Sequence, residues 1–366
     1  MSELLLLIDR LKPYGAERVC IDLATEFSSI RSTTVVTFGA DQGQVDVENQ
    51  PWRRLRIERS RWKPLAMLQV IWRLRCDLKK RGDVLVFSFM PLSNIIALVS
   101  TIGMPVRVVA TEHNISAQVL QGLGLKRQGL RFLRRVLYRR AHAIIAVSRA
   151  VEADLIDTVG VSELVHVIYN PVNLARLQAQ LAATTGVPPF VRALRASRED
   201  VKVIVIVGAL KHAKGHDIAI RALSLTPDNV HLVCVGDGAE RMGIKRLADT
   251  LGVGERLHLV GAVQQVGPWM KAADLVLVPS RYEGFGLVAV EAAGLGVQVL
   301  VTDVPGLREV GSMVGTSIVN AEPIPIAEES MRILSLTKRN NTYCVDRFLP
   351  AQVAKNYLLV AGEVVC

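Results

Sequence analysis

Short runs of apolar residues alternate along the chain with longer stretches in which apolar positions recur at helical spacing. Such runs, rich in valine, leucine and isoleucine, are typical of parallel strands buried on both faces of a sheet. In the first half we expect strands at 4–8, 33–38, 55–57, 84–88, 106–111, 143–147 and 165–168. In the second half we expect them at 203–207, 230–235, 257–260, 275–278 and 297–301. The alternation predicts an α/β chain with two parallel sheets.

A stretch that lacks this alternation separates the two halves. Between residues 174 and 200 the sequence is rich in glutamine, includes the turn Thr184-Thr-Gly-Val-Pro-Pro and carries mixed charge, which favours a boundary. We therefore expect four parts, which are a first domain over 1–175, a linker over 176–200, a second domain over 201–345 and a final helical segment over 346–366.

The most informative segment predicts a strand, a turn and a helix. Residues 275–279 are apolar, 280–285 form a polar turn with glycine, and a helical pattern begins at Gly286. In open α/β sheets, ligands bind at the carboxyl ends of strands, where the first N–H groups of the next helix attract anions. Glu283 and Glu291 flank this helix start, so a ligand with a central diphosphate and hydroxylated ends could contact both.

The run Glu283-Gly-Phe-Gly-Leu-Val-Ala-Val-Glu resembles the E-x7-E signature of family 4 glycosyltransferases. Two glutamates on a helix are more often a solvated face. Here the resemblance continues before them, in Val205-Ile-Val-Gly-Ala-Leu-Lys-His-Ala-Lys-Gly-His-Asp, and after them, in Val299-Leu-Val-Thr-Asp-Val-Pro-Gly-Leu-Arg-Glu-Val. It implies the GT-B fold, with two Rossmann-like domains facing a central cleft and a final helix that returns to the first domain.

The resemblance also implies roles for individual residues. Glu291 would bind the ribose hydroxyls of a nucleotide diphosphate sugar, Glu283 the hydroxyls of its sugar, and Lys214 its diphosphate. Backbone N–H groups would be presented to sugar or phosphate by Phe285, Gly286 and Leu287. Lys214 precedes a helix that we expect near Gly215, so positive charge would gather where the leaving group becomes negative.

One position in the phosphate loop departs from the family pattern. After Gly208 the family usually has an arginine, and Ala209 stands there instead. Lys211 could substitute as a point charge, although it lacks the planar fork of a guanidinium group.

Two loops of the first half also resemble the family. Thr111-Glu-His-Asn resembles its acceptor-side histidine loop, so His113 is expected to face the cleft, although a lone histidine is usually structural. The opening loop Lys12-Pro-Tyr-Gly-Ala-Glu-Arg corresponds to a glycine-rich loop in which Tyr14 replaces the first of two glycines and Gly15 remains. The candidate catalytic residues are therefore His113, Glu283 and Lys214.

Metal and redox chemistry are not expected. There is no Asp-x-Asp at a strand end, and no histidine, cysteine or carboxylate group has ligand spacing. The five cysteines contain no C-x-x-C pair, which suits a reducing cytosol. We therefore expect no metal and no cofactor beyond the donor substrate, in agreement with the metal independence that the resemblance implies.

The net charge of +10 is concentrated in the first half. Residues 1–195 hold 27 Lys/Arg against 16 Asp/Glu, and the remainder holds 17 against 18. Basic residues cluster at 53–81 and 126–140. On a helical wheel, the expected outward set is Arg127, Arg131, Arg134 and Arg135, and the expected inward set is Leu130, Leu133, Val136 and Leu137.

These basic clusters leave two interpretations open. The helix could be an ordinary solvated one, or it could approach an anionic membrane surface, aided by exposed Trp52, Trp62 or Trp72. A nucleic-acid partner is less favoured because no nucleic-acid-binding module accompanies the charge. The apolar run at 4–8 is too short for a secretory signal, and prolines and glycines divide 84–106, so neither predicts a membrane span.

Together these patterns predict a retaining glycosyltransferase. It would move a hexosyl group from a nucleotide diphosphate sugar to a glycan or lipid-linked acceptor, as in polysaccharide or lipopolysaccharide synthesis, at the cytoplasmic face of a membrane. The leaving phosphate would accept the proton of the acceptor hydroxyl. Two alternatives remain, a GT-B scaffold that has lost catalysis, for which Ala209 is the support, and a sugar-nucleotide epimerase.

Overall fold

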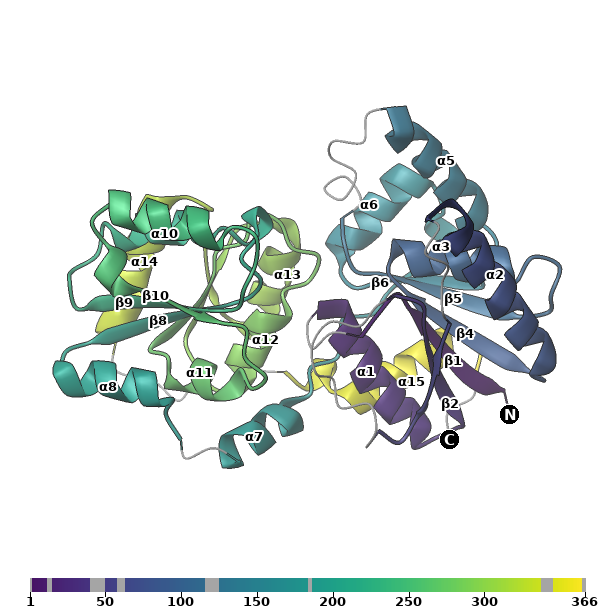
Figure 1. Cartoon of the computed structure of the whole chain (residues 1–366), viewed down its shortest axis with the longest axis horizontal. Coiled ribbons are helices and arrows are strands. Elements are labelled where there is room, and N and C mark those ends of the chain that lie inside the picture. Colours follow the sequence, from purple (N-terminus) through teal and green to yellow (C-terminus); the bar gives the residue numbers. More distant parts are fainter. Residues whose placement is uncertain are drawn as a thin grey trace. The chain divides into compact units, whose positions relative to one another are not determined.

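The computed structural model describes residues 2–11, 15–39, 50–57, 63–115, 125–183, 186–336 and 345–363 (Figure 1). The chain forms two compact units, one of residues 1–172 with 347–366 and the other of residues 173–346. Each unit is built on one parallel sheet, so the predicted α/β class with two Rossmann-like domains is confirmed. The predicted residues Tyr14 and Trp62 lie outside the described residues.

The first unit holds a seven-stranded sheet in the order β3-β2-β1-β4-β5-β6-β7. Its strands are β1 (Glu3–Ile8), β2 (Thr33–Thr37), β3 (Arg53–Arg56), β4 (Val84–Phe89), β5 (Arg107–Glu112), β6 (Ala143–Ala146) and β7 (Val165–Val167). Its helices are α1 (Gly15–Ser28), α2 (Lys63–Lys80), α3 (Pro91–Ser100), α5 (Leu125–Tyr138), α6 (Arg149–Val159) and α15 (Pro350–Val360), with short 3₁₀ turns at Ser162–Leu164 and Asp346–Phe348.

The second unit holds a six-stranded sheet in the order β10-β9-β8-β11-β12-β13. Its strands are β8 (Lys202–Val207), β9 (Val230–Val235), β10 (Leu257–Gly261), β11 (Leu275–Val278), β12 (Val299–Thr302) and β13 (Ser317–Val319). Its helices are α7 (Leu174–Ala182), α8 (Pro189–Ser197), α9 (His216–Leu223), α10 (Arg241–Thr250), α11 (Gly267–Ala272), α12 (Leu287–Gly294), α13 (Pro305–Val314) and α14 (Pro323–Ser335), with 3₁₀ turns at His212–Lys214 and Gly254–Arg256.

The region that the sequence marks as a boundary is folded. The range 176–200, expected as a linker, holds most of α7 and all of α8, and both helices belong to the second unit. Leu177 and Val191 are fully buried there, so each helix contributes an apolar residue to a core. β13 is absent from the expected strands because three half-buried residues give too short an apolar pattern.

The uncharged segment that begins at residue 84 forms β4 and α3, as its prolines and polar residues predict. All six residues of β4 are buried, which explains its apolar character within a sheet. In the described part of the chain, no helix is both long enough and apolar enough to cross a membrane.

The end of the chain completes the first unit. α15 packs against α1, and Tyr357 lies among aromatic rings, 5.8 Å from Phe87 and 6.5 Å from Phe27 between ring centroids. Beyond the helix, Glu363 forms ion pairs with Arg31, at 2.5 Å, and with Arg107. Residues from both ends of the sequence therefore share one core.

A buried polar cluster joins β5 to α3 and α5. Glu112, the last residue of β5, accepts hydrogen bonds from the Tyr138 hydroxyl, from Arg134 Nη2 at 3.1 Å and from Asn94 Nδ2 at 3.0 Å. The Ser88 hydroxyl donates to Asn94 Oδ1 at 2.7 Å. Burial and the neighbouring Glu112 carboxylate raise the pKa of Tyr138, so its hydroxyl stays protonated and donates. The cluster fixes the carboxyl end of β5 against two helices.

This cluster reverses part of the predicted orientation of α5. Arg134, expected at the surface, is only 2% exposed because the buried Glu112 needs a cationic partner. Leu133 and Val136, expected inside, are exposed, as is Phe132, at 70%. The outer surface of α5 is therefore mixed, with apolar side chains between basic ones.

The inward position of Arg134 leads to a stability prediction. Arg134→Ala should lower the free energy of unfolding by about 3–5 kcal/mol, because it leaves the Glu112 carboxylate buried without its charged partner. Arg139→Ala, which removes an exposed arginine just after the same helix, should change it by less than about 0.5 kcal/mol. Urea unfolding of the two variants measures the difference, and equal effects would contradict the assignment.

Candidate functional site

Two loops lie side by side at the carboxyl end of the second sheet. One follows β8 and the other follows β11, and these strands pair directly, with Val276 opposite Val205. Gly215, which ends the first loop, has a φ of +65°, and a Cβ there would lie 1.9 Å from the carbonyl oxygen of Pro279 in the second. Only glycine allows this approach, so Gly215 is required for the two loops to touch.

Lys214 and Glu283 meet across the two loops. Lys214 Nζ lies 2.5 Å from Glu283 Oε2, and the Ser280 hydroxyl donates to the same oxygen at 3.2 Å. Both charged side chains are partly exposed, so a ligand can reach them. The structure thus brings together two residues that lie 69 positions apart in the sequence and that were both predicted as site residues.

The start of α12 lies next to this pair. Gly286, the residue before the helix, has a φ of +96°, and no side chain caps the first turn. A Cβ on Gly286 would meet Leu307 at 2.3 Å, so the turn is closely packed. Phe285 is buried and Leu287 is the first residue of the helix, which places their N–H groups at its amino-terminal end. The amino-terminal end of a helix carries partial positive charge, which favours a negatively charged ligand.

Glu291 lies one helical turn farther along α12. It is 7% exposed and forms an ion pair with Arg176, with Nη2 at 3.3 Å from Oε1. Arg176 belongs to α7, inside the range expected as a linker, and sequence reasoning missed it. Only the packing of α7 against α12 could have revealed it, because no motif joins the two residues.

The remaining residues of the phosphate loop are arranged as follows. Gly208 follows β8 with a φ of +159°, and its carbonyl oxygen would lie 2.0 Å from a Cβ on Gly236. Lys211 directly precedes the 3₁₀ turn and its side chain is exposed, whereas Lys214 is the lysine that reaches Glu283. Arg281, a second residue that sequence reasoning missed, forms an ion pair with Asp217 at the start of α9.

His113 and Gly15 belong to the first unit. His113 directly follows β5, is 7% exposed and lies 6.0 Å from Phe89 between ring centroids. Burial lowers its pKa to about 3, so the ring is neutral at physiological pH. Gly15 is exposed and begins α1 with a φ of +54°, which suits a turn between β1 and α1.

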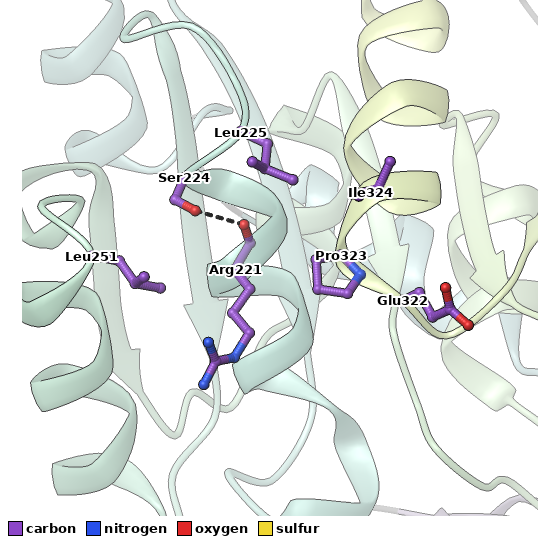
Figure 2. A pocket seen from close by; sticks show the side chains of 7 residues that line it. All are labelled: Arg221, Ser224, Leu225, Leu251, Glu322, Pro323 and Ile324. Carbon is purple, nitrogen blue, oxygen red and sulfur yellow. Dashed lines mark hydrogen bonds between the residues drawn. The ribbon is translucent and has the colours of Figure 1, made fainter.

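The described residues contain no cluster of metal ligands. No group of three or more histidine, cysteine, aspartate or glutamate side chains is arranged to hold a metal ion in that part of the chain. A cavity of about 390 Å³ lies at the ends of α9 and α10 and the start of α14, lined by Leu225, Leu251 and Ile324 among others (Figure 2). The length of α9 separates it from Lys214.

Comparisons with known proteins cover both units. A family model described as "Glycosyltransferase Family 4" matches residues 13–176, and one described as "Glycosyl transferases group 1" matches residues 190–343. The crystal structure of Anabaena HepE in complex with UDP and glucose is similar over 100% of both chains, with a TM-score of 0.81 and 21% identity. At that identity the likeness shows a shared fold.

Two curated relatives match part of the chain. An uncharacterised glycosyltransferase of Methanocaldococcus jannaschii is 34% identical over 172 residues, which cover 46% of this chain and 44% of that protein. A D-inositol 3-phosphate glycosyltransferase of Xylanimonas cellulosilytica is 33% identical over 181 residues, which cover 46% of this chain and 42% of that protein. The chain thus spans less than half the length of these relatives in the matched region.

The burial of His113 leads to a prediction about pH. In the folded protein the pKa of His113 is about 3, below its ordinary value of 6.5. Between pH 6.5 and pH 3, therefore, His113 binds a proton in the unfolded chain but not in the folded one. His113 should therefore contribute stability fully above about pH 6.5 and lose it progressively as the pH falls toward 3. NMR of the imidazole protons should show no titration of His113 between pH 5 and 8, with His113→Asn as the control that assigns the signal. A midpoint near 6.5 would contradict the prediction.

Proposed function

Because the chain belongs to the family 4 glycosyltransferases and has their GT-B fold, we propose that it transfers a hexosyl group from a nucleotide diphosphate sugar to an acceptor hydroxyl with retention at the anomeric carbon. The observation that carries this proposal is the Lys214–Glu283 pair at the amino-terminal end of α12. It offers a cation for a diphosphate and a carboxylate for sugar hydroxyls at one place.

Donor binding exchanges partners within this pair. The diphosphate takes the Lys214 ammonium group and the first N–H groups of α12, and the sugar hydroxyls donate to Glu283. Ser280 keeps its hydrogen bond to Glu283, so the carboxylate stays oriented after Lys214 leaves. The cost of separating the ion pair is modest, because both side chains are partly exposed and water already screens them.

Glu291 and Arg176 serve the nucleotide end of the donor. Arg176 holds one oxygen of the Glu291 carboxylate, and the ribose hydroxyls donate to that carboxylate. A carboxylate that is fixed before the ligand arrives loses less conformational entropy on binding. UDP sugars are the first donors to test, because HepE was crystallised with UDP and glucose.

The chemical step needs little from the protein beyond positioning and charge. The C–O bond between the sugar and the diphosphate breaks, and the positive charge of Lys214 and α12 stabilises the negative charge that forms on the leaving phosphate. The acceptor oxygen bonds to the anomeric carbon on the face that the phosphate leaves, and the phosphate takes the proton of that hydroxyl, so the configuration is retained. His113 is neutral, so it acts as a hydrogen-bonding partner for the acceptor and not as a cation.

The acceptor is proposed to be a lipid-linked or cell-surface glycan at the cytoplasmic face of a membrane. α2 carries an exposed apolar stripe, Leu65, Leu68 and Trp72, and Trp72 is 63% exposed. α5 presents Phe132 and Val136 among arginines, and α3 packs against both α2 and α5 (Figure 1). Apolar side chains surrounded by basic residues suit the interface of an anionic bilayer.

The tryptophans contribute unequally to this surface. Trp52, one of the three expected to be exposed, is 5% exposed and lies in the core, whereas Trp72 is available to a bilayer. Arg134 cannot contact a membrane either, because its side chain is buried in the ion pair with Glu112. Among the described residues, the proposed membrane contacts are the apolar stripe of α2 and the outer residues of α5.

The donor site leads to the first functional prediction. Lys214→Ala and Glu291→Gln should each lower kcat/KM for the donor by roughly 10- to 150-fold, since losing a charged hydrogen-bond partner is worth about 1.5–3 kcal/mol. Lys245→Ala, which removes an exposed lysine of α10, is the matched control and should keep full activity. Release of nucleoside diphosphate from candidate donors provides the assay.

The same assay separates the alternatives. Slow hydrolysis of the donor without acceptor is expected of a transferase, and neither an inactive scaffold nor an epimerase should release nucleoside diphosphate. Activity should be unchanged in EDTA, because Lys214 and α12 supply the positive charge. Full activity of Lys214→Ala, or dependence on added Mg²⁺ or Mn²⁺, would overturn the assignment.

The surface of α5 leads to a prediction about membranes. Replacing Arg131, Arg135 and Arg139 with glutamine should weaken binding to anionic liposomes and leave donor binding unchanged. Binding of the parent protein should fall steeply between low and physiological salt, because exposed charges are screened over about 8–10 Å. Glutamines in place of three exposed basic residues of the second unit, Lys245, Arg246 and Arg332, are the control. Equal binding to neutral and anionic liposomes would contradict the membrane role and would mean that α5 is an ordinary solvated helix.

A further inference from the structure

Arg281 holds the two loops of the donor site together. Its guanidinium group donates to both oxygens of Asp217, with Nη1 at 2.7 Å and Nη2 at 2.6 Å. Nη1 also donates to the carbonyl oxygen of His212 at 2.9 Å, and the Arg281 backbone N–H donates to that of Ala213, also at 2.9 Å. Four hydrogen bonds thus run from one residue of the β11–α12 turn to the loop and helix that follow β8.

The arrangement differs from that of the Lys214–Glu283 pair. That pair has a single ion contact, and the donor must separate it. The Arg281–Asp217 contact is bidentate and fixes direction as well as distance. Burial alone would raise the pKa of Asp217, but hydrogen bonds from Arg281 hold this pKa below its ordinary value. The contact is therefore ionic at neutral pH. The Lys214–Glu283 contact can therefore break while the Arg281–Asp217 contact remains.

We propose that Arg281 and Asp217 are positioning residues, which keep the Lys214 loop and the Glu283 turn in register while the donor separates Lys214 from Glu283. This inference rests on the proposed function. Without the side-chain clamp, once the donor has separated Lys214 from Glu283, the loop and the turn would, of these contacts, be joined only by the backbone hydrogen bond from Arg281 to Ala213 and by the packing of Gly215 against Pro279. Displacements of about 1 Å at such a site can lower turnover about 100-fold.

A direct role for Arg281 makes the opposite prediction for one variant. If Arg281 itself bound the diphosphate, Asp217 would compete for it, and Asp217→Ala would strengthen diphosphate binding. If Arg281 acts through the clamp, Asp217→Ala and Arg281→Ala should weaken binding alike. The sign of the change in Asp217→Ala therefore separates the two roles.

The experiment measures donor binding by calorimetry and donor turnover in the full chain. Arg281→Ala and Asp217→Ala should each lower kcat/KM by about 10- to 100-fold, chiefly by raising KM for the donor. The kcat/KM of the double variant should be no lower than that of the less active single variant, because both substitutions remove the same interaction. Arg281→Lys should rescue little, since an ammonium group cannot form the bidentate contact.

A nucleoside monophosphate provides the internal check on folding. The probe is UMP, GMP or AMP, whichever matches the diphosphate that the parent protein binds, and it lacks the second phosphate and the transferred sugar. It should bind each variant as well as it binds the parent protein, while the matching nucleoside diphosphate binds more weakly. Loss of both ligands would mean a general structural defect and would overturn the positioning role. The matched control is the exposed pair Arg332–Glu329 of α14, whose alanine variants should change nothing.

The outcomes also distinguish this inference from the function on which it rests. If the parent protein binds no nucleoside diphosphate among UDP, GDP and ADP, the proposed function fails. If it binds one, and the Arg281 and Asp217 variants behave like the Arg332 and Glu329 controls, only the positioning role fails. Tighter binding of the diphosphate by Asp217→Ala would also overturn it.

Discussion

The contact between the Gly215 backbone and the carbonyl group of Pro279 is the constraint on which the candidate site depends. A side chain at position 215 would overlap that oxygen, so the loop after β8 can approach the turn after β11 only through glycine. The approach brings Lys214 to Glu283 and Arg281 to Asp217. Parallel pairing of β8 with β11 makes the two loops neighbours, and the glycine at position 215 lets them come close enough for these ion pairs to form.

The charges of the site are neutralised before any ligand arrives. Lys214 pairs with Glu283, Arg176 with Glu291, and Arg281 with Asp217, and in each pair the partners come from different elements. A partly buried charge without a partner would destabilise the second unit. In the proposed function, the donor would exchange partners with these charges, and in the empty site the three pairs leave none of them without a partner.

Local patterns predicted much of this molecule, and distant partners account for what they missed. Five of six strands in the second sheet follow from apolar runs, and Glu283, Glu291 and Lys214 follow from motifs whose spacing is local. Arg176 could not be predicted, because its partner lies 115 residues away. The helical wheel of α5 placed Arg134 outside for the same reason, since the attraction of Glu112 comes from another element. Propensity decides which element forms, and tertiary charge pairing decides which side faces inward.

The return of the chain to the first unit sets the order in which the protein can be completed during synthesis. α15 supplies Tyr357 to the aromatic core beside α1, and Glu363 closes on Arg31 and Arg107. These residues leave the ribosome only after the whole second unit has been made, although their partners in the first unit emerge before it. Domains generally fold as units during translation. The second unit can therefore complete its core during synthesis before the first unit does, because the rings of Phe27 and Phe87 lack their partner Tyr357 until α15 has been made.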